Sequence, residues 1–406
     1  MVIGAFVIDS NFEFRHSNLT DMTELQSILA ALNVPSVLAT VMNVEGSAYR
    51  QPGARMLVMR DGRSIGTISG GCLEADVIER AWELTRVGQP ALIRYDTRGE
   101  DDQENLLADW GFGMGCNGAV DVLLERIDPA VPPDYLHSIA RALTERQTII
   151  CATVFARSGA APVEVGTRLF LDSSERTDFL SPVAAAARQA LREGRSRVTT
   201  VDFAQGSGEG SSLGSARVFC EKISPPPHLL VLGAGHDALP LVRLAAETGW
   251  MVSVCDRRES MATSQRFPRA AGVYAVPAEA SLSILPHAPD AAVVMTHRYP
   301  EDVKLLRLLV DSPARYIGVL GPRHRTDRLL HAAEISPTAD LMDRLHAPIG
   351  LDVGAETPEQ IALAILAEVT AALNGYLGGK LRDKGGPIRG PNSKHADGSF
   401  VSSFEF

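Results

Sequence analysis

The sequence predicts an α/β protein in which an N-terminal α+β domain with an internal duplication precedes a C-terminal Rossmann-type domain with a parallel sheet. The length of 406 residues is more than one hydrophobic core usually organises. One pattern of strands, glycines and a helix occurs twice before Pro225, and a glycine fingerprint follows an apolar strand after it. We expect an N-terminal extension at 1–20, the duplicated domain at 21–224, the Rossmann-type domain at 228–378 and a disordered tail at 379–406.

Two segments of the N-terminal half resemble each other. Ala39-Thr40-Val41 recurs as Ala152-Thr153-Val154, and Gly53-Ala54-Arg55 recurs as Gly166-Thr167-Arg168, both 113 residues later. Farther along the chain the offset falls to 106 and then to 96, so the second copy lacks two stretches of the first. Each copy has the pattern strand, loop, strand, helix, strand, strand. The repeat predicts a duplication of about 36–127 as 149–223, with helices near 74–87 and 182–194.

Both stretches that the second copy lacks carry a cysteine among glycines. One contains Gly70-Gly71-Cys72, directly before the first helix, and the other contains Gly113, Gly115 and Cys116. Glycines let a backbone approach an anion, a helix N-terminus offers free N–H donors, and a thiol there is favoured as the reactive thiolate. We therefore expect Cys72 and Cys116 to be the catalytic thiols, and the glycines with Arg50 to bind a phosphate or carboxylate. The plainer alternative is that each cysteine is a small residue in a tight turn.

The second half of the chain begins with a nucleotide-binding fingerprint. The apolar strand Leu229–Leu232 runs into Gly233-Ala234-Gly235-His236-Asp237-Ala238, which has the spacing G-x-G-x-x-A of a loop that opens a helix. The next strand ends at Asp256, 21 residues beyond Gly235, where the fingerprint needs a carboxylate for ribose hydroxyls. The acid favours a free 2′-hydroxyl, although Arg257 and Arg258 follow it and would tolerate a phosphate there.

Three histidine and arginine side chains are further candidates for ligand binding. His236 stands inside the fingerprint, where it either contacts a ligand or caps the turn. His297 and Arg323 follow the strands expected at Ala291–Met295 and Tyr316–Leu320, and ligands bind at the carboxyl ends of parallel strands. Both residues are otherwise ordinary members of surface turns.

The bulk composition argues against several classes of protein. The net charge of −10 argues against nonspecific binding of nucleic acid and against docking on an anionic membrane. The first residues have the pattern of neither a secretory signal nor a membrane span. The five cysteines include no C-x-x-C pair and no disulfide framework, which favours a cytoplasmic protein and gives little support for a zinc site. Cys151, Cys220 and Cys255 lie in apolar runs, and we expect them in the core.

Seven motifs in order resemble the XdhC/CoxI family, the xanthine dehydrogenase accessory factors: GSAYRQPGARM, GTISGGCLE, GFGMGCNG, VLGAGHDA, VVMTHRYPED, YIGVLGPR and PIGLDVGAETPEQIALAILAE. The resemblance implies a maturation factor, an accessory chaperone or sulfur relay more than a turnover enzyme. Such a factor binds molybdenum cofactor, supports its sulfuration and delivers it to a molybdenum hydroxylase of the xanthine dehydrogenase type. The implied partners are the apo-hydroxylase and a cysteine desulfurase. The family's thiol motifs fall on Cys72 and Cys116, and its Rossmann motif falls on Gly233, Gly235 and His236.

The residues suit that cargo, and they also leave two alternatives open. Molybdopterin carries a phosphate and a dithiolene-bound metal, for which glycine loops and soft thiolates are suitable groups. One alternative is an NAD(P)-dependent oxidoreductase, which would need an acid or base such as His297. The other is a docking chaperone whose Rossmann domain binds nothing. A homodimer is a further expectation.

Overall fold

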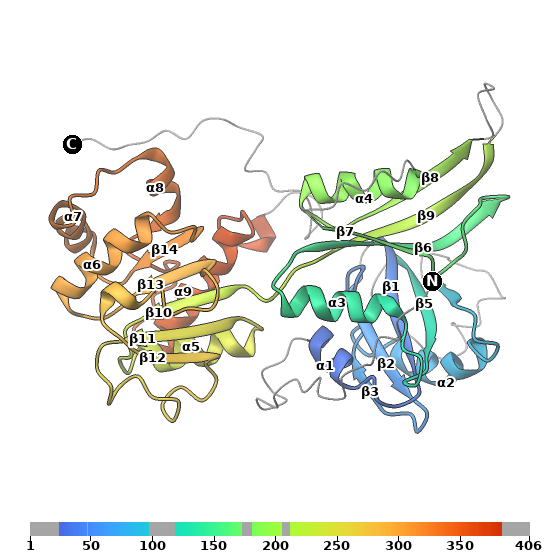
Figure 1. Ribbon diagram of the computed structural model, residues 1–406, viewed down its shortest axis with the longest axis horizontal. Helices are drawn as coiled ribbons and strands as arrows, with labels where there is room; N and C mark the ends of the chain where they lie inside the picture. The colour runs from blue at the N-terminus through green and yellow to red at the C-terminus, as the bar shows by residue number, and fades with distance from the viewer. Residues whose placement is uncertain (1–23, 47, 97–117, 173–180, 205–211, 384–406) are drawn as a thin grey trace, which may run out of the picture. The chain divides into compact units, whose positions relative to one another are not determined.

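The computed structural model describes residues 24–46, 48–96, 118–172, 181–204 and 212–383 (Figure 1). The chain divides into two compact units, Met1–Pro225 and Pro226–Phe406. Antiparallel sheets build the first unit and a parallel sheet builds the second, which confirms the predicted fold class. Among the described residues, no helix has the length and apolar character needed to cross a bilayer.

The first unit contains two antiparallel sheets, one from each predicted copy (Figure 1). The first copy has the strand order β3-β2-β1-β5-β4 and the second has β7-β6-β9-β8. The elements of the first copy are α1 (Glu24–Ala30), β1 (Ser36–Gly46), β2 (Arg55–Met59), β3 (Ser64–Gly66), α2 (Glu74–Leu84), β4 (Ala91–Asp96) and β5 (Gly118–Ile127). Those that follow are α3 (Asp134–Thr144), β6 (Ile149–Gly159), β7 (Arg168–Asp172), α4 (Pro182–Glu193), β8 (Arg197–Ala204) and β9 (Ser212–Ile223).

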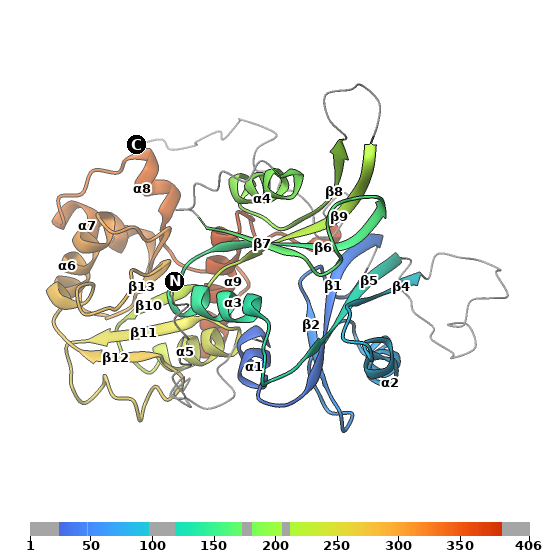
Figure 2. The same cartoon turned by 45° about the vertical axis from the view of Figure 1, so that its right-hand side comes forward.

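Each sheet is covered on one face by an amphipathic helix. Helix α2 packs against β1 and β5 (Figure 2), and α4 packs against all four strands of its own sheet. Helix α4 begins where Ser181 Oγ accepts a hydrogen bond from the Ala184 N–H at 3.1 Å. It ends at Gly194 in the left-handed conformation, with φ of 64°. Because Ser181 and Gly194 are residue types that favour helix ends, the sequence predicts the bounds of α4 to within one residue.

The two copies share their irregularities as well as their strands. The pairing of β1 with β5 shifts register between Val41 and Asn43, and that of β6 with β9 shifts between Val154 and Ala156. These shifts lie at equivalent positions of the repeat, 113 residues apart. A β-bulge is a specific local feature of a fold, so its occurrence at the same place in both copies supports a duplication.

Two reciprocal ion pairs join the copies. Arg55 of the first copy donates to Glu221 of the second, with Nη1 at 2.8 Å from Oε1 and Nη2 at 2.5 Å from Oε2. Arg168 makes the same two bonds to Glu125, at 2.8 and 2.5 Å. All four side chains are nearly buried, at 9–13% exposure. An apolar cluster of equivalent residues completes this interface: Met42, Leu123, Phe155 and Phe219.

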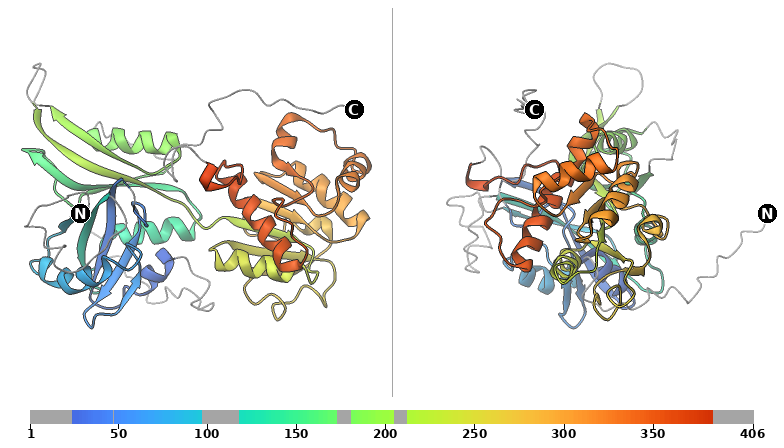
Figure 3. Two further views of the ribbon diagram at one scale, coloured as in Figure 1. Left: turned by 180° about the vertical axis from the view of Figure 1, so that it is seen from behind. Right: turned by 90° about the vertical axis from the view of Figure 1, so that its left-hand side faces the viewer.

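The second unit is a six-stranded parallel sheet with the order β12-β11-β10-β13-β14-β15. Its elements are β10 (His228–Leu232), α5 (Ala238–Glu247), β11 (Met251–Asp256), β12 (Gly272–Ala275), η1 (Ala278–Ala280), β13 (Ala291–Val294), α6 (Tyr299–Val310), β14 (Tyr316–Val319), α7 (Arg323–Ala332), α8 (Ala339–Arg344), β15 (Leu345–His346), α9 (Pro358–Leu373) and η2 (Leu381–Asp383). Helices α5 and α9 contribute to the core on one face, and α6, α7 and α8 to the core on the other (Figure 3). The strand order reverses between β10 and β13, which is where such folds bind ligands. The short helix η2 lies inside the segment predicted as a tail.

Removing one partner of a reciprocal ion pair should destabilise the first unit strongly. We expect Glu221→Ala to cost about 3–5 kcal/mol, because it leaves the Arg55 guanidinium buried without its carboxylate. Urea unfolding of the full chain, followed by circular dichroism, measures this loss. Glu83→Ala is the control, since Glu83 pairs with Arg86 on the surface, and it should cost no more than about 0.5 kcal/mol. Equal losses in the two variants would contradict the role assigned to the buried pair.

Candidate functional site

The glycine loop after β10 lies directly against the end of β13. Gly233 has φ of +122°, and a Cβ at this position would lie 2.5 Å from the Met295 carbonyl oxygen. A Cβ on Gly235 would collide with Oδ1 of Asp237. Only glycine fits at position 233, whereas at Gly235 a larger residue would require the Asp237 side chain to move, and the loop leads to the start of α5. The His236 side chain is exposed on this loop.

Asp256, at the end of β11, closes the glycine loop from the other side. Its Oδ2 accepts the Ala234 N–H at 2.8 Å, and Arg258 contributes its own N–H at 2.8 Å, Nε at 2.9 Å and Nη2 at 2.6 Å. Burial alone would raise the pKa of this carboxyl, but the hydrogen bonds from Arg258 and Ala234 outweigh it and lower the pKa to about 2. The ribose contact predicted for Asp256 stays a prediction, because the hydrogen bonds described for the carboxylate come from the protein itself.

His297 ties the turn after β13 to the glycine loop. Its Nε2 lies 2.7 Å from Oδ2 of Asp237, and its ring is largely exposed. The backbone of His297 has φ of 57°, which is uncommon for a residue with a side chain. The structure therefore brings His297 and the predicted loop residues together, whereas Arg323 lies exposed at the start of α7.

A buried acid that the sequence reasoning missed supports the same turn. Asp302 of α6 is 1% exposed. It accepts hydrogen bonds from the Thr296 hydroxyl and from Arg325 Nη2, the latter at 2.6 Å. The signal in the sequence was weak, because an acid in the first turn of a helix is common for reasons of the helix dipole alone. Arg325, two residues beyond the predicted Arg323, is the arginine that binds Asp302.

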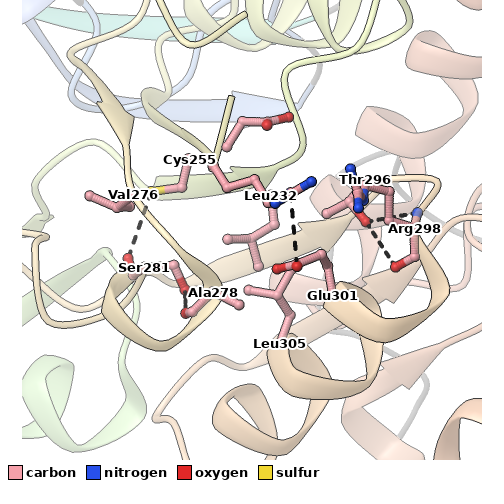
Figure 4. Close-up of a pocket in the computed structure, with 11 residues that line it drawn as sticks. Leu232, Cys255, Val276, Ala278, Ser281, Thr296, Arg298, Glu301 and Leu305 are labelled. Carbon is pink, nitrogen blue, oxygen red and sulfur yellow. Dashed lines mark hydrogen bonds and ion pairs between the residues drawn. The ribbon is translucent and has the colours of Figure 1, made fainter. Parts of the chain in front are cut away.

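A small crevice opens at the carboxyl edge of the sheet, between the ends of β10, β11 and β13 (Figure 4). Val276, Ala278 and Ser281 lie on one side of it, and Thr296 and Glu301 lie on the other. The enclosed space is about 20 Å³, room for about one water molecule. Its remaining lining residues are Leu232, Cys255, Asp256, Arg257, Arg298 and Leu305. Of these, only Asp256 is a predicted binding residue.

The first cysteine loop is held in shape by a glutamate and a serine. Oε1 of Glu74 accepts the N–H groups of Ile68 and Ser69 at 3.2 and 2.8 Å. The Ser69 hydroxyl donates to Glu74 and accepts the N–H groups of Gly71 and Leu73, each at 3.1 Å. Burial acts to raise the pKa of Glu74, but the bonds from Ser69 outweigh it and lower the pKa. The carboxylate is therefore an ionised anchor for a fixed loop.

Cys72 is partly exposed at the end of this loop. Its side chain packs along one edge of the apolar core beneath α2. Gly70 and Gly71 are exposed, and a Cβ on Gly71 would meet no atom within 4 Å. The described loop therefore exposes its glycines to solvent and partly buries the Cys72 thiol. The reactivity of this thiol stays a prediction.

Arg50 does not face open solvent as a free anion-binding group. Its Nη2 donates to both carboxylate oxygens of Glu24 in α1, at 2.7 and 2.9 Å. The predicted residue is thus bound to a carboxylate of the protein itself. The other predicted residues of this half, Gly113, Gly115 and Cys116, lie outside the described residues.

The cysteines expected in the core are buried there. Cys151, Cys220 and Cys255 are at most 3% exposed. Burial raises the pKa of Cys151 to about 11 and the pKa values of Cys220 and Cys255 to about 12. These thiols stay protonated at neutral pH. Within the described ranges, Cys72 is the one cysteine with partial exposure.

Adding a methyl group at Gly233 should disturb the whole carboxyl edge. We expect Gly233→Ala to destabilise the second unit by about 1–3 kcal/mol, because φ of +122° is unfavourable for alanine and its Cβ would collide with Met295. Thermal unfolding measures this change. Gly379→Ala is the control, since a Cβ there would meet no atom within 4 Å. A Gly233→Ala protein as stable as the control would show that the loop does not have the described conformation.

Because folding lowers the pKa of Asp256, its carboxylate should stabilise the second unit above about pH 4 and lose that effect toward pH 2. The stability difference between wild type and Asp256→Asn should therefore be largest near pH 5 and shrink as the pH falls through this window. Urea unfolding at several pH values measures the difference. A difference that stays constant down to pH 2.5 would contradict the ionised, hydrogen-bonded state of Asp256.

Comparisons with known proteins agree with the resemblance carried by the motifs. Residues 29–96 match the model of the XdhC and CoxI family, and residues 229–369 match that of the XdhC Rossmann domain. The chain is 37% identical over 343 residues to a probable xanthine dehydrogenase component of Bacillus subtilis (strain 168), and the match covers 82% of this chain and 92% of that protein. It is 24% identical over 338 residues to the molybdenum cofactor insertion chaperone PaoD of Escherichia coli (strain K12), and the match covers 83% of each.

A solved structure has the same fold over most of its length. The crystal structure of a xanthine dehydrogenase from Bacillus halodurans superposes with a TM-score of 0.66 and 28% sequence identity, and the match covers 87% of this chain and 96% of that chain. With the relative from Bacillus subtilis matched over nearly its full length, the resemblance is confirmed: the chain belongs to the XdhC and CoxI family.

Proposed function

We propose that the protein is an accessory factor that binds molybdenum cofactor, supports its sulfuration and inserts it into a molybdenum hydroxylase of the xanthine dehydrogenase type. The names of two relatives support this role, since one is a probable component of xanthine dehydrogenase and the other is a molybdenum cofactor insertion chaperone. The observation that carries it is the loop of Cys72, which hydrogen bonds hold in a fixed shape before α2, in a stretch of the first copy that the sequence of the second copy lacks.

The comparison of the copies isolates that loop. Helix α4 of the second copy starts from a plain cap at Ser181. Helix α2 of the first copy follows instead a loop that contains Gly70, Gly71 and Cys72, and Glu74 and Ser69 hold this loop by hydrogen bonds. Because the four strands common to both sheets form the shared scaffold, we assign the function to the added stretches, of which this loop is the described one.

The chemistry of the loop fits this cargo. A cysteine thiolate is a soft ligand, suited to molybdenum and to the transfer of sulfur, and exposed glycine backbone allows a large planar molecule to approach closely. In this role Cys72, together with Cys116, holds the cofactor or passes sulfur to it from a cysteine desulfurase. The apo-hydroxylase is the second partner, and a homodimer remains compatible with this function.

The oxidoreductase alternative has less support in the structure. It requires an acid or base at the carboxyl edge and a nicotinamide dinucleotide bound beside it. His297 has a suitable place for the first role, but its Nε2 is engaged by Asp237. The carboxylate that would hold the ribose, Asp256, is engaged by Ala234 and Arg258.

Replacing either of the two predicted catalytic thiols should impair cofactor handling without unfolding the protein. We expect Cys72→Ser and Cys116→Ser each to retain about tenfold less molybdenum cofactor, because a hydroxyl is a much poorer ligand for a soft metal than a thiolate. Activation of the apo-hydroxylase should fall in parallel. The measurements are the fluorescent oxidised pterin released from purified protein and the activity of the hydroxylase after mixing.

The matched control is Cys220→Ala, which removes a thiol buried in the core of the second copy. It should retain the cofactor to the same extent as wild type, provided that circular dichroism shows it folded. Wild-type retention and activation in both serine variants would end the proposal that these thiols handle the cofactor.

A further inference from the structure

The Rossmann fold of the second unit implies a dinucleotide such as NAD(P), so each contact of such a ligand can be compared with the residues present. The phosphate end fits. Gly233 lets the loop pass close against the end of β13, where a Cβ would collide with the Met295 carbonyl oxygen. A tight glycine turn of this kind is what the diphosphate of such a ligand requires. The ribose end does not fit, for two reasons.

The first reason is that the carboxylate that would bind ribose is saturated. An ionised carboxylate has about four lone-pair sites, and Asp256 accepts four hydrogen bonds from the protein. Three of these come from Arg258, which donates its backbone N–H, Nε and Nη2 to the same carboxylate. Asp256 is also 7% exposed. A ribose diol would have to displace the guanidinium of Arg258 to reach it.

The second reason is the pair of opposite charges that lines the crevice beside Asp256. Arg257, which follows β11, faces Glu301 of α6 on this crevice, with Nε at 3.9 Å from Oε1. The position of a bound nucleoside is thus lined by opposite charges that attract each other.

We propose that the second unit excludes nicotinamide dinucleotides, and that Arg258 is the residue that determines this specificity. Arg258 binds Asp256, and Asp256 in turn fixes the glycine loop through the Ala234 N–H. The acid of the fingerprint therefore acts as an internal anchor and not as a ribose acceptor. This exclusion does not depend on molybdenum cofactor being the cargo. The glycine loop can still bind a ligand that has no ribose diol near the end of β11.

Calorimetric titration of the full chain with NAD and with NADP tests the exclusion. Wild-type protein should bind both with Kd above about 1 mM, which corresponds to little more than nonspecific contact. Arg258→Ala frees two acceptor positions on Asp256 and should bind NAD at least about tenfold more tightly than wild type, the gain expected from charged hydrogen bonds to a diol. The double variant Arg258→Ala, Asp256→Asn should lose that gain.

Arg298→Ala is the matched control, because it removes one positive charge beside the same crevice without freeing Asp256. It should show no gain in NAD binding. If Arg258→Ala proves unfolded by circular dichroism, Arg258→Gln keeps much of the side chain and removes the bidentate fork, and the same gain is expected. Wild-type binding of NAD or NADP with Kd below about 1 mM would overturn the exclusion. A folded Arg258 variant with no gain would overturn the role of that residue.

Discussion

Two buried ion pairs, Arg55 with Glu221 and Arg168 with Glu125, determine how the first unit is built. Each joins the second strand of one copy to the last strand of the other, through two parallel hydrogen bonds. Loss of either carboxylate would leave a guanidinium in the interior, where an unpaired charge is very costly. Since the two pairs are reciprocal, neither copy satisfies its own arginine, and the duplicated sheets form one compact unit.

The places where the copies differ carry the specialisation of the unit. Asp121 and Arg217 occupy equivalent positions of the repeat, and they bind each other, with Nη1 of Arg217 at 3.0 Å from Oδ2 of Asp121. Two identical copies would place two like charges at this position. The ion pair between Asp121 and Arg217 therefore favours the pairing of the two different copies over the pairing of two identical ones. The segment that carries Cys72 is a second difference, since the sequence of the second copy is shorter there. Shared positions thus serve the scaffold, and unshared positions are where function is to be sought.

Much of this fold is predictable from sequence because the signals are local or periodic. Two repeated triplets, each found again 113 residues later, predict the duplication. Ser181 and Gly194 mark the two ends of α4. The apolar runs of the second half predict its buried parallel strands. The motifs in order also predict the family, although its site residues remain untested.

The partners of charged side chains are not predictable in the same way. Nothing local indicates that Arg55 binds Glu221, 166 residues away, or that Arg50 binds Glu24. The fingerprint correctly places Asp256 at the end of its strand, but its spacing does not reveal that Arg258 folds back onto the carboxylate. Likewise, the contacts of Asp302 with Thr296 and of Glu301 with Arg257 depend on how α6 packs on the sheet. Such contacts are set by tertiary structure, which a spacing rule does not contain.

We propose that this chain carries molybdenum cofactor and not a nicotinamide dinucleotide. The test is native mass spectrometry of full-length protein purified from cells that make the cofactor. We expect a bound species with the mass of the molybdenum–pterin compound and no species with the mass of NAD or NADP. A protein that carries the dinucleotide, and no molybdenum, would contradict it.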